Sequence, residues 1–235
     1  MELDWEFMRH TFFLALKGVP VALNITLVTL LISIPLGFVI AIVRNNKKHP
    51  WISKILAVYV SYNRGTPIIV QIYIIYNMLP YLIFGFCKTM HINFDIYSLD
   101  NVIYAYVVFS LSYIAFLSEA FRSGLGTVHK GQYEAAMVVG MSDFQSYRRI
   151  VVPQAITALL PILCTNITGL IKMTSLSFSM AIFDITAIAK VEASAKLCFI
   201  EAYLDITIIY VVLCLIVELI FKIIESKVKT HRACV

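Results

Sequence analysis

The amino-acid sequence is dominated by long apolar stretches that contain no acidic or basic residue. Asp, Glu, Lys and Arg are absent from residues 18–43, 65–87, 101–118 and 150–171. A helix of about 20 apolar residues spans the hydrocarbon core of a bilayer, and hydrocarbon offers no partner to an unpaired backbone amide, so such segments span as helices. A fifth apolar stretch runs from Ala202 to Ile224. We therefore predict an all-α integral membrane protein with five transmembrane helices, at about residues 19–43, 55–79, 100–121, 155–180 and 202–224.

Composition and charge support this prediction. Of the 235 residues, 60% are hydrophobic and 14% are charged, whereas soluble domains carry about 25% charged residues. The first apolar stretch is too long, and is followed by too many others, to be a cleaved signal peptide. The net charge of +5 comes from basic residues dispersed over several segments, which argues against a nucleic-acid partner. The five cysteines show no metal-binding spacing, and we interpret them as small apolar residues.

The distribution of lysine and arginine predicts the orientation. These residues gather in residues 44–54, 122–149 and 222–232, whereas the opposite side carries only Arg9, Lys17, Lys88, Lys190 and Lys196. Cytoplasmic loops are the ones enriched in basic residues. We therefore predict an outer amino terminus and a cytoplasmic carboxyl terminus, on opposite sides because the number of spans is odd.

The spans form one predicted membrane domain, residues 19–225, with short flanking segments. Aromatic and acidic residues alternate in residues 1–18, which favours an interfacial helix on the outer surface. Residues 226–235 form a predicted cytoplasmic tail, and residues 80–99 form the longest predicted outer loop. Within residues 181–201, the spacing of Ile185, Ile188 and Val191 predicts a short amphipathic outer helix.

The second span is interrupted by the sequence RGTP at Arg64–Pro67. Proline removes a backbone amide and disfavours helix at the preceding residue, so we expect a kink or an unwound turn. Interrupted helices at membrane depth lie against protein or a water-filled cavity. Two interpretations stay open, a translocation pathway at the interruption or a kink at the cytoplasmic interface with Arg64 reaching lipid headgroups.

The cytoplasmic segment 130–153 begins with a predicted helix of about two turns. The helix carries Glu134 and the small residues Ala135 and Ala136. Gly140 is placed to end it, because glycine readily adopts the left-handed conformation of a helix carboxyl terminus. Small side chains let such a projection approach the backbone of another protein.

A second short helix is predicted to follow. Ser142 or Asp143 can cap it, and it leads to Ile150. Pro153 then begins the next span, at a position where its missing amide costs little. Segment 130–153 is therefore predicted to be a rigid helical projection rather than a solvated loop.

The spacing of Glu134, Ala135, Ala136, Gly140, Ile150 and Pro153 resembles the signature cytoplasmic loop of ABC importer permeases. Three further segments are similar to the polar amino-acid permeases of this family, of the histidine, glutamine and cystine types: RGTPIIVQIYIIYNMLP, SYIAFLSEAFRSGLGTVHKGQ and LIKMTSL. The resemblance covers about residues 17–225. It departs from the family at Met173, where many relatives have aspartate, and at Cys164-Thr165, where a glycine-asparagine pair is usual.

The resemblance implies a type I ABC importer permease of the bacterial cytoplasmic membrane. Its expected partners are a second permease subunit, identical or different, a cytoplasmic ABC ATPase dimer and an extracytoplasmic solute-binding protein. The loop would dock into a cleft of the ATPase through Glu134–Pro153. The expected substrate is a polar amino acid, and the segment that follows LIKMTSL looks most like the cystine-type permeases.

The chain is expected to leave ATP hydrolysis to its partner. Gly126 and Gly131 have the spacing of a phosphate-binding loop, but Gln132 occupies the position that requires lysine. We therefore predict no cofactor and no enzymatic activity in this polypeptide.

Polar residues inside the spans are candidates for the translocation pathway. They are Gln71, Asn77, Glu119, Asn166 and Lys172. Glu119 has a competing and favoured interpretation, an ion pair with Arg122 three residues later. Lys172 lies about 17 residues into the fourth span, where a cation faces a cavity or marks the outer part of the helix.

Two other functional classes are weighed against the importer. A stand-alone secondary transporter would take up amino acid without an ATPase, and the sequence lacks the inverted repeat and carboxylate relay typical of that class. A membrane scaffold or enzyme subunit is the third class, and no catalytic constellation favours an enzyme. Co-purification with an ATPase separates the importer from both.

Overall fold

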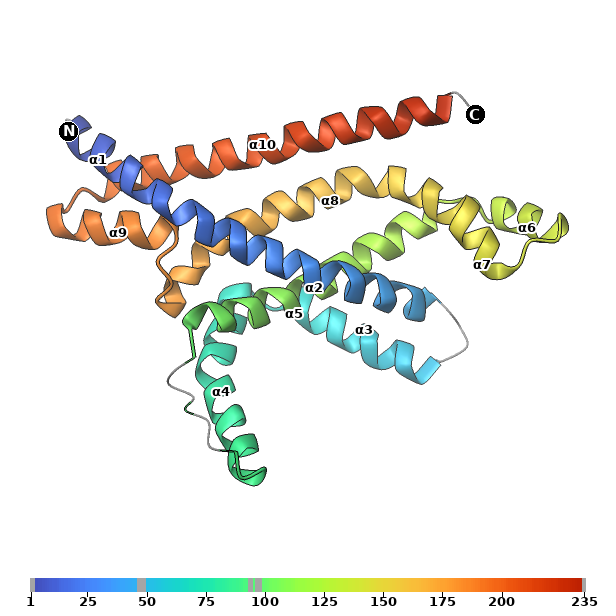
Figure 1. Cartoon of the computed structure of the whole chain (residues 1–235), viewed down its shortest axis with the longest axis horizontal. Coiled ribbons are helices and arrows are strands. Elements are labelled where there is room, and N and C mark those ends of the chain that lie inside the picture. Colours follow the sequence, from blue (N-terminus) through green and yellow to red (C-terminus); the bar gives the residue numbers. More distant parts are fainter. Residues whose placement is uncertain (1–2, 46–49, 93–94, 96–98, 234–235) are drawn as a thin grey trace.

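The structure is a computed structural model that describes residues 3–45, 50–92, 95 and 99–233 (Figure 1). Every regular element within these ranges is helical. The α-helices are α1 (Trp5–Ala15), α2 (Val19–Asn45), α3 (Pro50–Gly65), α4 (Ile68–Thr89), α5 (Asn101–Gly126), α6 (Lys130–Val138), α7 (Asp143–Ser146), α8 (Val152–Thr174), α9 (Ile185–Lys196) and α10 (Phe199–Ala233). A π-helical turn, Tyr147–Val151, joins α7 to α8, and a 3₁₀ segment, Ser175–Met180, follows α8.

Five helical runs are long and apolar enough to span a membrane, within the part of the chain that the structure describes. They are Trp5–Asn45, Ile68–Thr89, Asn101–Gly126, Asp143–Met180 and Phe199–Val228. The number of spans agrees with the prediction from the sequence. The amino and carboxyl termini lie at opposite ends of the bundle (Figure 1), as an odd number of spans requires.

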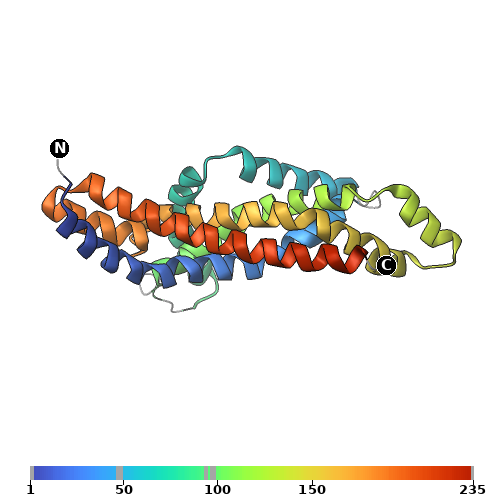
Figure 2. The same cartoon turned by 90° about the horizontal axis from the view of Figure 1, so that it is seen from above.

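The long axis of the molecule is formed by α2, α5, α8 and α10 (Figures 1 and 2). Helix α5 lies at the centre, packed against α2 and α8, and α8 packs in turn against α10. Helices α6 and α7 project at one end, which we call the loop end, and α9 covers the opposite end (Figure 2).

Close packing of α2 and α5 explains why the core forms here. A Cβ atom on Gly37 would lie 3.2 Å from the α5 backbone at Ile114, which is tighter than most such contacts, so glycine favours this close approach. Small residues at helix contacts are the usual device in membranes, where burial of apolar surface gives little driving force. The buried side chains of α5 then form two apolar layers, one around Val108 and Phe109 and another around Leu117 and Phe121.

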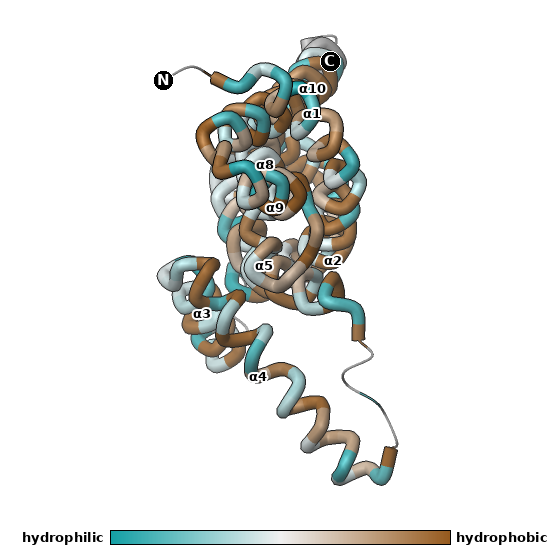
Figure 3. Tube along the Cα trace, turned by 90° about the vertical axis from the view of Figure 1, so that its left-hand side faces the viewer, coloured by the Kyte–Doolittle hydropathy of each residue, from teal (hydrophilic) through white to brown (hydrophobic). Residues whose placement is uncertain are grey.

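The predicted second span differs most from the structure. The interruption at RGTP separates two helices, because α3 ends at Gly65 and α4 begins after Pro67. Helix α4 turns away from the bundle (Figures 1 and 3) and continues to Thr89. The outer loop predicted from residue 80 therefore begins as helix, and Pro80 lies within α4.

The amino-terminal helix also differs from the prediction of a separate interfacial element. One 3₁₀ turn, Leu16–Gly18, joins α1 to α2 in a continuous helical run. Phe7, Thr11 and Ala15 are buried, and α1 packs against α9 and α10. Its aromatic residues therefore serve partly in helix packing, and its place at the membrane surface stays a prediction.

The predicted tail is largely part of the last helix. Helix α10 runs through residue 226, where the tail was expected to begin, and continues to Ala233. The final two residues lie outside the described part of the chain. No proline or glycine stands between residues 199 and 233 to end the helix, which explains its length.

Candidate functional site

The segment predicted to couple the protein to a partner is a pair of short helices. Helix α6 carries Glu134 and Ala135 exposed and Ala136 buried. Gly140 follows with φ of +83°. The amide of Gly140 donates to the carbonyl of Met137 at 3.0 Å, and that of Met141 to the carbonyl of Ala136 at 3.1 Å. These two bonds form a Schellman motif, and the positive φ confirms the left-handed helix end predicted at Gly140.

The second helix is capped by Ser142 rather than Asp143. The Ser142 hydroxyl accepts from the amide of Gln145, and the Gln145 side chain accepts from the amide of Ser142. Asp143 instead accepts a hydrogen bond of 2.8 Å from the Tyr133 hydroxyl, which ties α7 to α6. This bond is the main cause that raises the pKa of Tyr133 above its usual value.

Ile150 and Pro153 lie at the junction between the loop and the fourth span. Ile150 belongs to the π-helical turn, in which the amide of Val152 donates to the carbonyl of Tyr147. Pro153 is the second residue of α8 and has no amide to donate. The wider turn therefore keeps the helix continuous from α7 into α8, where the sequence predicts a new start at Pro153.

The tip of this projection is apolar and exposed. Val138 is 87% exposed, Val139 73% and Phe144 71%. Large apolar side chains gathered at the end of a projecting element are typical of an interaction surface. The sequence motif did not single out these three residues, because it is defined by the small residues beside them.

A cavity of about 710 Å³ lies beneath the projection, between it and the ends of α2 and α5. Rings of Phe38, Tyr133, Phe144 and Tyr147 line it together with Arg148. The rings of Tyr133 and Tyr147 meet edge to face with centroids 5.6 Å apart. The projection is therefore braced by contacts among its own aromatic residues, and Tyr133 also packs on the cluster around Leu117 and Phe121.

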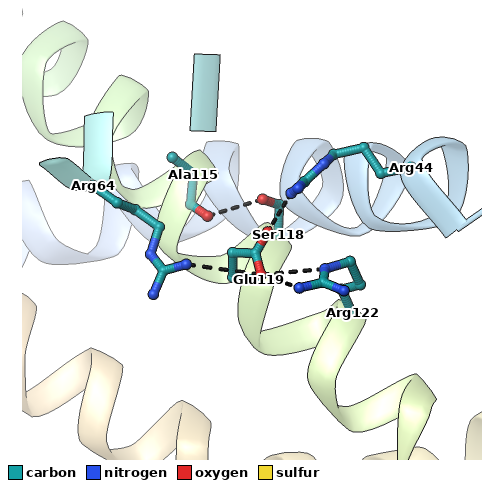
Figure 4. A network of polar contacts seen from close by, with 6 residues as sticks. All are labelled: Arg44, Arg64, Ala115, Ser118, Glu119 and Arg122. Carbon is teal, nitrogen blue, oxygen red and sulfur yellow. Dashed lines mark hydrogen bonds and ion pairs between the residues drawn. The ribbon is translucent and has the colours of Figure 1, made fainter. Parts of the chain in front are cut away.

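Glu119 is the centre of a cluster of charged residues that joins three helices (Figure 4). Its carboxylate accepts from Arg122 at 2.7 Å and from Arg44 of α2, and Arg64 of α3 lies 3.7 Å away. The ion pair with Arg122 agrees with the favoured interpretation of the sequence. Arg44 and Arg64 were not predicted as its partners, since they come from distant parts of the chain.

Gln71, another predicted pathway residue, is used at the break between α3 and α4. Its side-chain amide donates to the carbonyls of Asn63 and Thr66 at 2.9 and 3.0 Å, and its oxygen accepts from Ser112. The residue is buried. Gln71 thus pairs the Asn63 carbonyl, for which Pro67 has no amide to offer, and the Thr66 carbonyl, which lies free because the Val70 amide donates to Pro67.

The other three pathway residues are more accessible. Asn77 is exposed on α4, Asn166 is half-buried on α8, and Lys172 is exposed on α8. The amides of Asn77 and Asn166 donate to carbonyls of their own helices. A role of these residues in a pathway stays a prediction.

The accessible face of α8 differs in character from that of α2. On α2 it presents Leu23, Leu27 and Leu31, as expected of a helix in contact with lipid. On α8 it presents small and polar residues at helical spacing: Ala158, Pro161, Thr165, Gly169 and Lys172. Such a face suits a protein partner or a polar cavity better than hydrocarbon.

Fold and loop together define a helical multi-pass membrane protein with a helical projection at one end. A family model described as "Binding-protein-dependent transport system inner membrane component" matches residues 33–230, and the chain belongs to this family. It is a multi-pass protein of the plasma membrane and the permease subunit of an ABC importer, a class that works with an ATPase and a second permease subunit.

Individual relatives agree with this assignment. The chain is 34% identical to "Probable amino-acid permease protein YxeN" of Bacillus subtilis (strain 168) over 95% of each chain. It is 32% identical to "L-cystine transport system permease protein TcyL" of the same organism, over 91% of this chain and 86% of the relative.

Solved structures share the fold. A chain of an amino acid ABC transporter crystallised with histidines superposes with a TM-score of 0.80 and 25% identity, over 97% of this chain and 100% of the other. The MetNI methionine ABC transporter superposes with a TM-score of 0.72 and 15% identity, over 92% and 96%. The fold is that of type I ABC importer permeases.

Proposed function

We propose that this permease moves a polar amino acid into the bacterial cytoplasm, with L-cystine as the first candidate. The names of the relatives support the substrate class, since they include amino-acid and L-cystine permeases. An extracytoplasmic solute-binding protein delivers the substrate, and ATP is bound and hydrolysed by the partner ATPase rather than by this chain. The loop end faces the cytoplasm and the α9 end faces outward.

The exposed apolar tip carries the proposal. Val138, Val139 and Phe144 enter a cleft of the ATPase, while Glu134 and Ala135 lie exposed on the adjoining helix. Helix α7 continues into α8 through the π-helical turn. A movement of the tip is therefore passed to the fourth span, whose small and polar face borders the pathway between two permease subunits.

Substitution of Gly140 tests this coupling. No atom lies within 4 Å of a Cβ atom built on Gly140, so a large side chain there leaves the protomer core intact and extends toward the ATPase. The positive φ adds about 1 kcal/mol of local strain for any other residue. We expect Gly140→Trp to abolish ATP-driven amino-acid uptake in proteoliposomes while the protein still inserts into membranes.

Gly140→Ala is the matched control, because it carries the same strain at positive φ but adds only a Cβ atom, which has no neighbour within 4 Å, and it should support uptake. Normal uptake by Gly140→Trp would contradict the coupling role. A cysteine at Val139 is expected to crosslink to the co-purified ATPase. Uptake by the purified chain without any ATPase would instead identify a secondary transporter.

A further inference from the structure

Two residues of opposite charge lie exposed within neighbouring spans. Lys172 belongs to the run that includes α8, and Glu218 belongs to α10. Both side chains are exposed in the protomer. A charged residue inside a span is unfavourable in hydrocarbon and therefore faces a polar cavity or a protein partner.

Contacts between α8 and α10 place the two charges along the same helix interface. The helices pack side by side and run in opposite directions (Figures 1 and 2), and the Cys214 sulfur lies 3.9 Å from the carbonyl oxygen of Thr168. Lys172 follows Thr168 by one turn, and Glu218 follows Cys214 by one turn. Because the helices are antiparallel, the two charges lie on opposite sides of this contact.

Electrostatic contacts agree with this placement. Cys214 interacts with both Lys172 and Glu218, and Cys164, one turn before Thr168 on α8, interacts with Glu218. At a rise of 1.5 Å per residue, the two charged residues are separated by about 12 Å along the helix interface. This separation exceeds that of an ion pair between the two backbone positions. Fully extended toward each other, the two side chains would nearly meet, whereas in less extended conformations they leave room for a small molecule between their charged ends.

We propose that Lys172 and Glu218 bind the two charged groups of a zwitterionic α-amino acid, with its carboxylate on Lys172 and its ammonium on Glu218. The inference rests on the proposed function, and it names the groups that recognise the substrate. The accessible residues between the two charges fit this role, since Thr165 and Asn166 are polar and Gly169 is small. Pairing both charges of the substrate also removes the need for water at each of them.

The test uses the complete transporter, permease with its ATPase and binding protein, in proteoliposomes. Uptake of labelled L-cystine, L-histidine, L-glutamine and L-arginine is measured separately for the wild type, Lys172→Gln and Glu218→Gln. We expect each variant to raise the half-saturating concentration of the transported amino acid about tenfold or more, because a hydrogen bond to a charged group is lost. Lys88→Gln, an exposed lysine at the end of α4, is expected to behave as the wild type.

Competition with analogues assigns each charge. Amino-acid amides lack the carboxylate, and N-acetyl amino acids lack the ammonium. The wild type should prefer the free amino acid to both. The Lys172→Gln variant should no longer prefer the free amino acid to the amide but should still prefer it to the N-acetyl compound. The Glu218→Gln variant should show the opposite pattern. A purely structural role of the two residues would not produce this difference.

Three outcomes overturn the inference. Unchanged half-saturating concentrations in both variants, with normal wild-type uptake, refute it and leave the proposed function intact. Dissociation of the complex on gel filtration in both variants assigns the charges to subunit packing. Absence of ATP-driven uptake of all four amino acids by the wild type refutes the proposed function together with the inference.

Discussion

Glu119 shows at the scale of single residues what a sequence can and cannot predict. Its pair with Arg122 lies on one helix turn and follows from the spacing alone. Arg44 and Arg64 reach it from α2 and α3, so these contacts depend on how the helices pack. One carboxylate shared by three guanidinium groups holds α2, α3 and α5 together, which argues for a structural role over a place in the pathway.

Gly140 and Ser142 were predictable because their roles are local. A glycine after a short helix and a serine before the next one are recognisable without knowledge of the rest of the fold. Val138, Val139 and Phe144 were not, because an apolar residue in a membrane protein is not unusual until the structure shows it exposed outside the bundle.

Asp184 is expected to make stability depend on pH. It is fully buried at the start of α9, where its carboxylate accepts from the amide of Ala187 at 2.8 Å. Burial raises its pKa to about 6 from 3.8, although the hydrogen bonds oppose the shift. The folded protein therefore retains the Asp184 proton more strongly than the unfolded chain, so stability falls as pH rises from about 4 to about 6, by about 3 kcal/mol.

Asp184→Asn isolates this contribution. Asparagine caps a helix as well as aspartate does but does not titrate. Between pH 4 and pH 7, the thermal unfolding midpoint in detergent should fall more for the wild type than for the variant. At pH 7 the variant should be the more stable protein. Parallel pH profiles of the two proteins would show that Asp184 does not control this transition.

At the scale of helices, element types were easier to predict than boundaries. The RGTP interruption and the helical loop followed from proline and glycine chemistry. The sequence did not indicate that α4 continues past Pro80, because this depends on neighbouring residues that compensate for a missing hydrogen bond. It also did not indicate that α1 joins α2, because this depends on the residues that cover one face of α1. The π-helical turn before Pro153 is a further example, since a wider turn accommodates what was expected to be a break.

The break between α3 and α4 is expected to depend on Gln71. Its amide pairs two carbonyl groups that the interruption leaves free. Gln71→Leu leaves them buried without a donor, which should reduce the free energy of unfolding by about 1–3 kcal/mol. Hydrogen exchange around residues 62–66 should become faster in the variant.

Asn77→Leu is the control for this substitution, because the Asn77 side chain is exposed and its amide donates to the Tyr73 carbonyl of the same helix. It should change the unfolding free energy little. Equal destabilisation by both substitutions would mean that the hydrogen bonds of Gln71 to the carbonyl groups at the break make no specific contribution to the free energy of unfolding.

At the scale of the whole molecule, the number of spans and the opposite positions of the termini were predictable from the apolar stretches alone. The direction of α4 and the pairing of α8 with α10 were not, because apolar composition says which segments enter the membrane but not which faces meet. For the same reason, the sequence did not identify Glu218 as a candidate pathway residue, because its position opposite α8 depends on which helix faces meet.

Orientation in the membrane can be tested with cysteine labelling. Ser142 lies exposed in the projecting loop and Ser194 lies exposed on α9. After replacement of the natural cysteines, we expect Ser194→Cys to react with an impermeant maleimide on intact cells, and Ser142→Cys only after permeabilisation. The reverse result would invert the predicted topology and remove the basis for coupling at the loop end.

The direction of α4, away from the helix bundle, affects how much of the protein accumulates in a cell. Only 11% of the apolar segment of α4 is buried within the protomer, and Tyr73 and Asn77 are exposed along this helix. Association with another subunit stabilises a folded state by mass action. An unassembled subunit therefore leaves most of α4 uncovered. We expect membrane proteases to degrade unassembled subunits, so that the abundance of the partner subunit determines the abundance of this chain.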